Sequence, residues 1–426
     1  MDRKSTGAPD KEVILSVSEY TTYSMNARSL FVLGRLPAIG RAELESLLGA
    51  SHVSPAGETA VLSDIPAPNI PFTRLGSSVK LAEYLGTIPA TDMRSAQNGL
   101  NSFALKCAED IPEGKIQLGV SAYGVQTSPQ QLMAVGLNLK KTLRAHGYSV
   151  RLIPNEAADL SSAQVLHNHL VGERGIELIV VRDGTQLVVG RSVAVQDINA
   201  YAARDQGRPK RDARVGMLPP KLAQTIVNLA VGQATPTVET AVLDPFCGTG
   251  VVLQEASLMG FGIYGTDLEP RMIAYTGDNL KWLEDTFVRS KPLNDEKSAC
   301  ALEVGDATTH RWQPMPNFVA SEVYLGQPLS SWPAPEKLRT IVGTCNVIIE
   351  KFLHNISNQL VRGTRLCLAV PAWQSPAGHF SHLPLLDHLA EMGYNRVSFE
   401  HVRTEELVYY RPDQLVAREL LVITRN

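Results

Sequence analysis

The stretch TAVLDPFCGTGVVLQEASLMG, residues 240–260, decides the fold of the C-terminal half. The apolar residues before Asp244 predict a strand, DPFCGTG predicts a turn, and the apolar-rich segment after it predicts a helix. Gly248 and Gly250 let the backbone approach a ligand closely, because they carry no Cβ. Ligands of parallel sheets bind just beyond the carboxyl ends of the strands. We therefore expect a ligand-binding turn here, with Phe246 among its contacts.

The composition of this turn argues against one common ligand. A loop that binds a nicotinamide dinucleotide needs a third glycine three residues after the second, and Leu253 stands there. A carboxylate at the strand end, Asp244, repels phosphates and attracts an ammonium group. The turn therefore predicts a ligand that carries an ammonium group.

Two more acids end the strands that follow. In GIYGTDLEPRM, residues 262–272, Asp267 closes a second strand, where a carboxylate accepts both hydroxyls of a ribose. Capping of the next helix is an alternative role at the same place. In LEVGDATTH, residues 302–310, Asp306 closes a third strand and suits the amino group of an adenine. Three acids at the ends of successive strands predict one shared binding site.

The order of strand and helix patterns predicts the domain organisation. Strands and helices alternate from Ala241 to the end, which is typical of an α/β fold with a doubly wound parallel sheet. Smaller α/β units precede it. We expect a poorly ordered, disordered tail over 1–27, an α/β unit over 28–95, a second one over 96–200, a basic linker over 201–220 and the doubly wound domain over 221–426.

Local patterns add detail to the two N-terminal units. The first is expected to hold a strand and a helix over residues 29–49 and a second helix over 77–88. The second has a strand over 115–123, then a helix capped by Ser128. It ends in a hairpin that turns at Asp183-Gly184, a pair favoured by type I′ turns. The order βαβαββ predicts a compact layered unit.

The composition is that of an ordinary globular protein. Of 426 residues, 44% are hydrophobic and 19% are charged, and the net charge is −3. No apolar run approaches the roughly 18 residues that a membrane span needs, and the first twenty residues lack the apolar core of a signal peptide. The five cysteines are scattered, which argues against disulfides and structural zinc. We expect a cytoplasmic protein without a metal site.

A basic run joins the two halves. It holds six basic residues and only two acidic ones between residues 204 and 221. The basic residues are Arg204, Arg208, Lys210, Arg211, Arg214 and Lys221. Such a run is able to follow a phosphate backbone, and a solvated linker is the alternative. The first five of the six are our candidate contacts to a nucleic-acid backbone.

Three segments together resemble a known family. DPFCGTG, the element around Asp267 and the run RPKRDARVGMLPPKLAQTIVNLA, residues 208–230, look like those of the THUMP-domain tRNA guanine-N(2) methyltransferases. These archaeal and eukaryotic enzymes modify guanosine at position ten. DPFCGTG is shared with DNA amino-methyltransferases, and the run over 208–230 is the more specific part.

The resemblance covers most of the chain and implies an assignment for each unit. Residues 28–95 would be a ferredoxin-like domain, 96–200 a THUMP RNA-binding domain, and 221–426 a Rossmann-like class I methyltransferase domain. It implies S-adenosyl-L-methionine as the cofactor, held by Asp244, Phe246, Gly248, Gly250, Asp267 and Asp306. The implied partner is tRNA, with a small activator subunit as a further candidate.

One segment departs from the family pattern. The family carries Asp-Pro-Pro-Tyr after the fourth strand, and here NFVAS runs into EVYLG, residues 322–326, with neither proline. One alignment places Ser321 at the family Asp and Tyr324 at its Tyr, and another places Glu322 at the acid. We favour Glu322 as the acceptor of the target amine, with Tyr324 near the base. Methylation of another RNA base or of DNA, or cofactor binding without catalysis, are the competing hypotheses.

Overall fold

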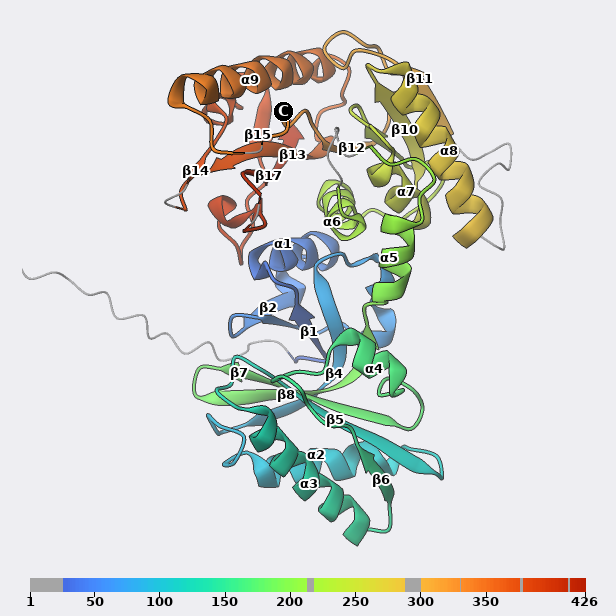
Figure 1. Ribbon diagram of the computed structural model, residues 1–426, viewed down its shortest axis with the longest axis vertical. Helices are drawn as coiled ribbons and strands as arrows, with labels where there is room; N and C mark the ends of the chain where they lie inside the picture. The colour runs from blue at the N-terminus through green and yellow to red at the C-terminus, as the bar shows by residue number, and fades with distance from the viewer. Residues whose placement is uncertain (1–25, 213–217, 288–299, 330, 376–377, 413) are drawn as a thin grey trace, which may run out of the picture.

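The computed structural model describes residues 26–212, 218–287, 300–329, 331–375, 378–412 and 414–426 (Figure 1). Each half of the molecule is built on one β-sheet. The C-terminal half is stacked on the N-terminal half along the longest axis, with helix α5 (Ile198–Gln206) between them. The tail predicted over 1–27 lies, up to residue 25, outside the described residues.

The N-terminal half has one eight-stranded sheet of order β2-β3-β1-β4-β8-β7-β5-β6. In chain order its strands are β1 (Ser29–Leu33), β2 (Val53–Ala56), β3 (Ala60–Ser63), β4 (Ser78–Ile88), β5 (Lys115–Tyr123), β6 (Ser149–Leu152), β7 (Gly175–Asp183) and β8 (Gln186–Val195). Its helices are α1 (Pro37–Leu48), α2 (Gln97–Glu109), α3 (Pro129–Ala145) and α4 (Ser162–His167). Side chains of α2 and α3 form one core with β5, β7 and β8. The βαβαββ order predicted from residue 115 onward is confirmed.

The helix predicted over residues 77–88 is wrong, because residues 78–88 form strand β4. β4 pairs antiparallel with β1 on one edge and with β8 on the other. Leu81 and Ala82 are buried on opposite faces of it, in two different cores. Backbone partners on both edges therefore override an apolar spacing that also suits a helix. The β4–β8 pairing makes the sheet continuous across the boundary predicted near residue 95.

The C-terminal sheet has the order β11-β10-β9-β12-β13-β17-β15. Its strands are β9 (Ala241–Asp244), β10 (Gly262–Asp267), β11 (Cys300–Val304), β12 (Phe318–Glu322), β13 (Arg365–Gln374), β15 (Tyr394–Arg396) and β17 (Val416–Arg425), with β14 (Phe380–Ser381) on β13 and β16 (Val408–Tyr409) on β17. Its helices are α6 (Pro220–Val231), α7 (Val251–Leu258), α8 (Pro270–Phe287) and α9 (Pro335–Ser357). The first five strands of this order are parallel, and β17 runs antiparallel to β13.

The direction of winding reverses at β9. The chain passes from β9 to β10 and β11 on one side and then returns to β12 on the other side. Such a switch point opens a crevice at the carboxyl ends of the two central strands. The predicted doubly wound sheet is confirmed, and the last strand in its order, β15, pairs antiparallel with β17.

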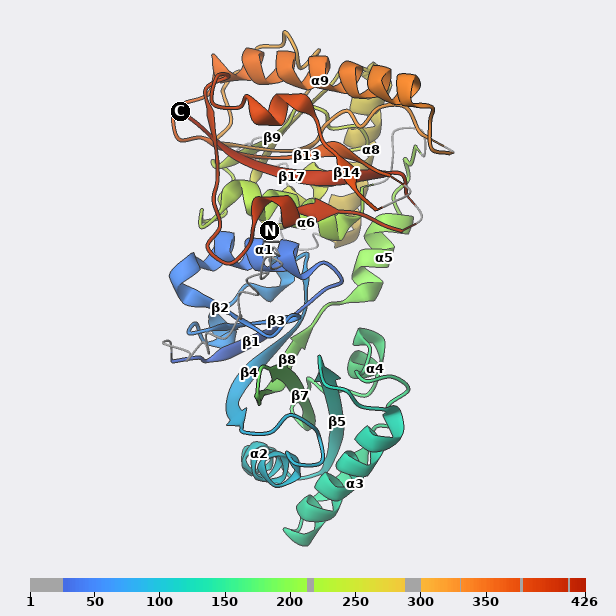
Figure 2. The same ribbon diagram turned by 90° about the vertical axis from the view of Figure 1, so that its left-hand side faces the viewer.

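The two halves meet where α1 packs against α6 (Figure 2). The carboxylate of Glu43 on α1 is fully buried there, and it accepts hydrogen bonds from the N–H groups of Gly76 and Ser77 and from the side chain of Asn228 on α6. Burial raises the pKa of Glu43. These three donors offset the desolvation of the carboxylate. α6 is buried on nearly all sides because it lies between α1, α7 and the sheet.

A glycine at residue 76 is required by this contact. A Cβ added at Gly76 would lie 2.0 Å from the carbonyl oxygen of Lys221 and 2.6 Å from Oγ1 of Thr225. The carbonyl oxygen of Lys221 belongs to the backbone of α6, so it cannot move aside by a change of rotamer as a side chain could. Gly76 therefore sets how closely the N-terminal sheet approaches the C-terminal half.

We expect Gly76→Ala to lower the free energy of unfolding by roughly 1–3 kcal/mol, as overpacking of a tight contact does. Urea unfolding of the full chain measures it. Gly343→Ala is the matched control, because a Cβ at this exposed position of α9 meets nothing within 4 Å and alanine is the better helix former. If the two variants are equally stable, Gly76 is not in the close contact with α6 described above.

Candidate functional site

Acids at the carboxyl ends of adjacent strands gather around one cavity. Asp244 is the last residue of β9, Asp267 the last of β10, and Asp306 follows β11 by two residues. Glu322, the last residue of β12, lies on the other side of β9. All four line a cavity of about 780 Å³ at the switch point of the sheet. The structure thus brings together the three acids singled out in the sequence and adds a fourth from the altered segment.

The turn between β9 and α7 forms one wall of the cavity. Gly248 and Gly250 have φ of 52° and 81°, in the left-handed region that favours glycine. The N–H of Gly248 donates to Oδ2 of Asp267 at 2.9 Å. Phe246 and Gly248 line the cavity, as expected of ligand contacts. Gly250 does not line it, and a Cβ there would lie 2.7 Å from Thr276 of α8.

Asp244 is the most deeply buried acid of the cavity, with 2% of its surface exposed. Its Oδ1 accepts the hydroxyl of Ser321 at 2.6 Å and the N–H of Phe246 at 3.2 Å. Within the described part of the chain, its Oδ2 has no donor. The pKa of Asp244 is raised to about 7, mainly by burial and also by the charges of Asp267 and Glu322, while the two hydrogen bonds lower it. The site therefore holds a carboxyl group without a cationic partner among the described residues.

The other two strand-end acids are held by turns. Asp267 accepts N–H groups from Gly248 and Glu269, one on each oxygen, and burial raises its pKa. Asp306 uses Oδ1 for the N–H and the hydroxyl of Thr308, at 2.9 and 2.7 Å. These hydrogen bonds fix the direction of both carboxylates.

The segment that departs from the family pattern closes the far side of the cavity. Glu322 and Tyr324 line it, and Ser321 does not. Ser321 is fully buried and donates its hydroxyl to Asp244. Oε1 of Glu322 accepts a hydrogen bond from Nε of Arg418 at 2.9 Å. Of the two alignments considered, the one with Glu322 therefore puts the acid at the cavity.

Sequence reasoning missed two contributions to the site. Val347, Ile348 and Lys351 of α9 form another part of the lining, and α9 had not been singled out. The spacing of Val347 and Lys351, four residues apart on one helix face, is the signal that was available. Arg418 has no local motif, because it reaches Glu322 from a strand 96 residues away in the sequence.

The basic run at the junction makes mostly internal contacts. Arg204, on α5, pairs with Glu255 of α7 through two hydrogen bonds of 2.8 and 3.2 Å. Arg208 is buried against Asp205. The linker predicted over 201–220 is thus partly helical and docked, in contrast to the expectation that both arginines face RNA. Their charges are neutralised within the fold.

The remaining candidates of the run differ in exposure. Lys210 lies 3.5 Å from Asp278 and is half-exposed. Arg211 is exposed, and Arg214 lies outside the described residues. Among the described members of the run, Lys210 and Arg211 are therefore the best candidates for contact with RNA.

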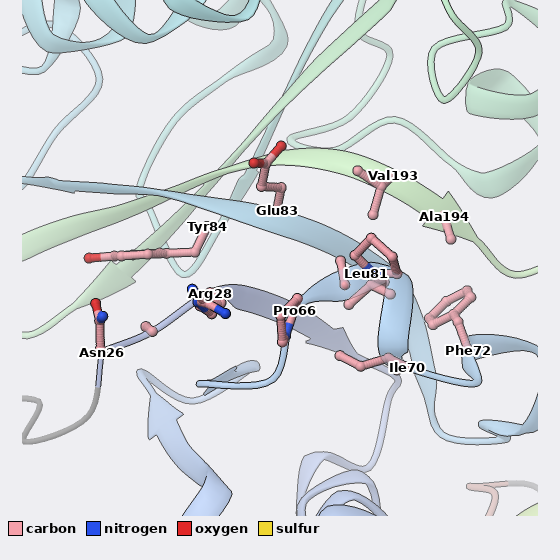
Figure 3. Close-up of a pocket in the computed structure, with 13 residues that line it drawn as sticks. Asn26, Arg28, Pro66, Ile70, Phe72, Leu81, Glu83, Tyr84, Val193 and Ala194 are labelled. Atoms are coloured by element: carbon pink, nitrogen blue, oxygen red, sulfur yellow. The ribbon is translucent and has the colours of Figure 1, made fainter.

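A second cavity, of about 700 Å³, lies on the N-terminal sheet (Figure 3). Figure 3 shows Phe72 and Leu81 toward one end of the lining, with Arg28 and Tyr84 toward the other. Its lining is mainly apolar and includes none of the four acids described above. We therefore place the chemistry at the C-terminal cavity.

Two further searches concern only the part of the chain that the structure describes. None of its helices is long and apolar enough to cross a membrane. No group of three or more His, Cys, Asp or Glu side chains there is arranged to hold a metal ion.

The fold, and part of the sequence, are similar to those of methyltransferase domains. Residues 208–286 match the family model of the RMKL-like methyltransferase domain. A solved structure described as a possible methylase, from Clostridium difficile 630, superposes with a TM-score of 0.51 at 10% identity, over 92% of this chain and 97% of that one. At this identity, the likeness concerns the fold.

Two curated relatives share more of the sequence. The tRNA (guanine(10)-N2)-dimethyltransferase of Methanothermobacter thermautotrophicus is 46% identical over 159 residues, which are 37% of this chain and 39% of that protein. The enzyme of the same name from Pyrococcus abyssi is 28% identical over 156 residues, 34% of this chain and 45% of that protein. The chain thus spans less than half the length of the curated relatives it matches.

The raised pKa of Asp244 predicts a pH-dependent penalty on stability. The carboxyl ionises near pH 4 in an unfolded chain and near 7 in the fold. The folded protein therefore binds the extra proton between these values, and stability falls as pH rises from about 4 to 7. At pH 8, Asp244→Asn should be more stable than wild type by roughly 1–4 kcal/mol, a difference that shrinks toward zero at pH 4. Unfolding at both pH values measures it, and a difference independent of pH would contradict the assignment.

Proposed function

We propose that the protein is an S-adenosyl-L-methionine-dependent methyltransferase that modifies the 2-amino group of a guanosine in tRNA. One observation carries the proposal. Asp244, Asp306 and Glu322 each use a single carboxylate oxygen for donors within the described residues, and the second oxygen has none there. A cavity with three such oxygens suits a ligand rich in N–H groups and positive charge.

The lining fits the cofactor group by group. Asp244 would accept the ammonium group, and its carboxyl ionises fully when that cation lies beside it. Asp267 accepts ribose hydroxyls and Asp306 the adenine amino group, each with lone pairs left after its turn contacts. Phe246 and Gly248 contact the ligand from the turn. The crevice at the switch point is where an open α/β sheet binds nucleotides.

The reaction then depends mainly on position. When bound, the cofactor supplies an electrophilic methyl group on a sulfonium, so the sulfur leaves with the bonding electrons as the amine nitrogen supplies its own pair. The lone pair of a guanine amine is delocalised into the ring, and an acceptor for its N–H groups draws it toward the attacking geometry. Glu322 provides that acceptor, and Tyr324 packs against the base.

We assign tRNA recognition to the N-terminal half. We assign residues 28–95 to a ferredoxin-like domain and 96–200 to a THUMP domain, and the βαβαββ order from residue 115 onward supports the second assignment. The named activity of the relatives above, on guanosine at position ten of tRNA, favours tRNA over DNA. Lys210 and Arg211, beside the junction of the halves, extend the proposed RNA surface toward the cavity.

Glu322→Gln tests the chemical step. It keeps size and an acceptor oxygen but removes the charge, so we expect methyl transfer to tRNA to fall by about 10²-fold, as loss of one preorganised acceptor does. Affinity for S-adenosyl-L-methionine, measured by calorimetry, should stay within a few-fold of wild type. Ser321→Ala is the comparison variant and should affect transfer less.

Wild-type rates in Glu322→Gln would show that Glu322 is not the acceptor of the target amine. If wild-type protein binds both cofactor and tRNA yet transfers nothing, with and without candidate activator subunits, the non-catalytic hypothesis replaces this one.

Salt dependence tests the RNA surface. Affinity for tRNA should fall steeply with salt, and replacing Lys210 and Arg211 by Gln together should flatten the slope by up to about two units, one for each lost phosphate contact. The control replaces Arg204 and Glu255 by Gln together, which removes both partners of an internal ion pair, and should leave the slope unchanged. If the variant without Lys210 and Arg211 shows the wild-type salt dependence, the basic run is a solvated linker and does not contact RNA.

A further inference from the structure

Arg418 holds the acid that the proposed reaction needs. Its Nε donates to Oε1 of Glu322 at 2.9 Å, and its Nη1 donates to Gln414 at 3.1 Å. The side chains of Arg418 and Glu322 are only 8% and 13% exposed. Glu322 lines the cavity, and Arg418 stands behind it.

The register of the sheet explains why these two side chains meet. β13 lies between β12 and β17, and its Ala369 pairs with Glu322 on one side and with Leu420 on the other. Side chains two residues apart on a strand share a face, so Arg418 is on the same face as Leu420 and Glu322. The intervening Ala369 is small, which leaves the guanidinium a diagonal path across the strand.

The two carboxylate oxygens of Glu322 have different surroundings. Oε1 is occupied by Arg418, and Oε2 has no donor in the described part of the chain. A guanidinium with a second anchor loses little freedom when it binds a carboxylate. Glu322 therefore has one oxygen fixed from behind while the other remains available to a ligand.

We propose that Arg418 is a positioning residue, which orients Glu322 so that Oε2 accepts an N–H of the target amine. This rests on the proposed function. As the amine nitrogen bonds to the methyl carbon and the carbon–sulfur bond breaks, the nitrogen becomes positively charged and loses one proton. Glu322 receives that proton and passes it to solvent. Fixing the acid across the sheet replaces the fixed turn that two prolines would give.

A double-mutant cycle tests the proposal, with Arg418→Met, Glu322→Gln and both together. Arg418→Met should lower kcat on tRNA by about 10-fold or more, with KM for tRNA and affinity for S-adenosyl-L-methionine within a few-fold of wild type. In the Glu322→Gln background, the same change should have little further effect. Arg418→Lys keeps the positive charge but lacks the planar guanidinium, so we expect its kcat to lie between those of Arg418→Met and the wild type.

A readout without turnover accompanies the cycle. In urea unfolding, Arg418→Met should destabilise the protein more when Glu322 is present than when it is Gln, because only then is a buried charge left unpaired. Arg396→Met is the matched control, since Arg396 pairs with Glu419 of the same strand β17 and does not line the cavity. It should leave kcat unchanged.

The outcomes separate this inference from the proposed function. If the wild-type protein has no transferase activity, the proposed function is wrong. The unfolding measurements still show whether Arg418 and Glu322 interact. If the wild type is active and Arg418→Met keeps its kcat, or lowers it equally with Glu322 and with Gln at that position, Arg418 has only a structural role and the inference is overturned.

Discussion

The site depends on a carboxyl group that is buried at the end of the central strand and has no cationic partner among the described residues. Asp244 is 2% exposed, and burial raises its pKa to about 7. A group in this state destabilises the free fold near neutral pH and is stabilised by a cationic ligand. Asp267 and Glu322 add to the negative potential around it. The neighbouring strands, the glycine turn and α9 all border the cavity into which this carboxyl faces.

A second buried acid, Glu43, lies where the two halves meet, and its carboxylate is hydrogen-bonded to donors from both halves. Glu43 accepts from two backbone N–H groups and from Asn228, and Gly76 lets the chain approach α6 closely. Asp244 differs because one of its oxygens has no donor among the described residues. That contrast separates a structural acid from one suited to a ligand: both are buried, but within the described part of the chain only Glu43 has donors on both oxygens.

Sequence reasoning reached the C-terminal half best, because the signals there are local. A strand, a glycine turn and a helix are contiguous in residues 240–260, and the strand-end acids follow from the direction of a parallel sheet. It failed for β4, whose strand character comes from partners far away in the sequence. It also misread Arg204, because a charge run does not show that Glu255 lies within reach. The Arg418–Glu322 pair was beyond it for the same reason: register across three strands is a property of the folded sheet.

The most direct test of the central claim is the identity of the product. The protein would be incubated with unmodified tRNA transcripts and S-adenosyl-L-methionine that carries a deuterated methyl group, and the digested nucleosides analysed by mass spectrometry. The account predicts the label in N2-methylated guanosine, and its loss when Glu322 is replaced by Gln. Label in another nucleoside, or in none although cofactor and tRNA both bind, would contradict it.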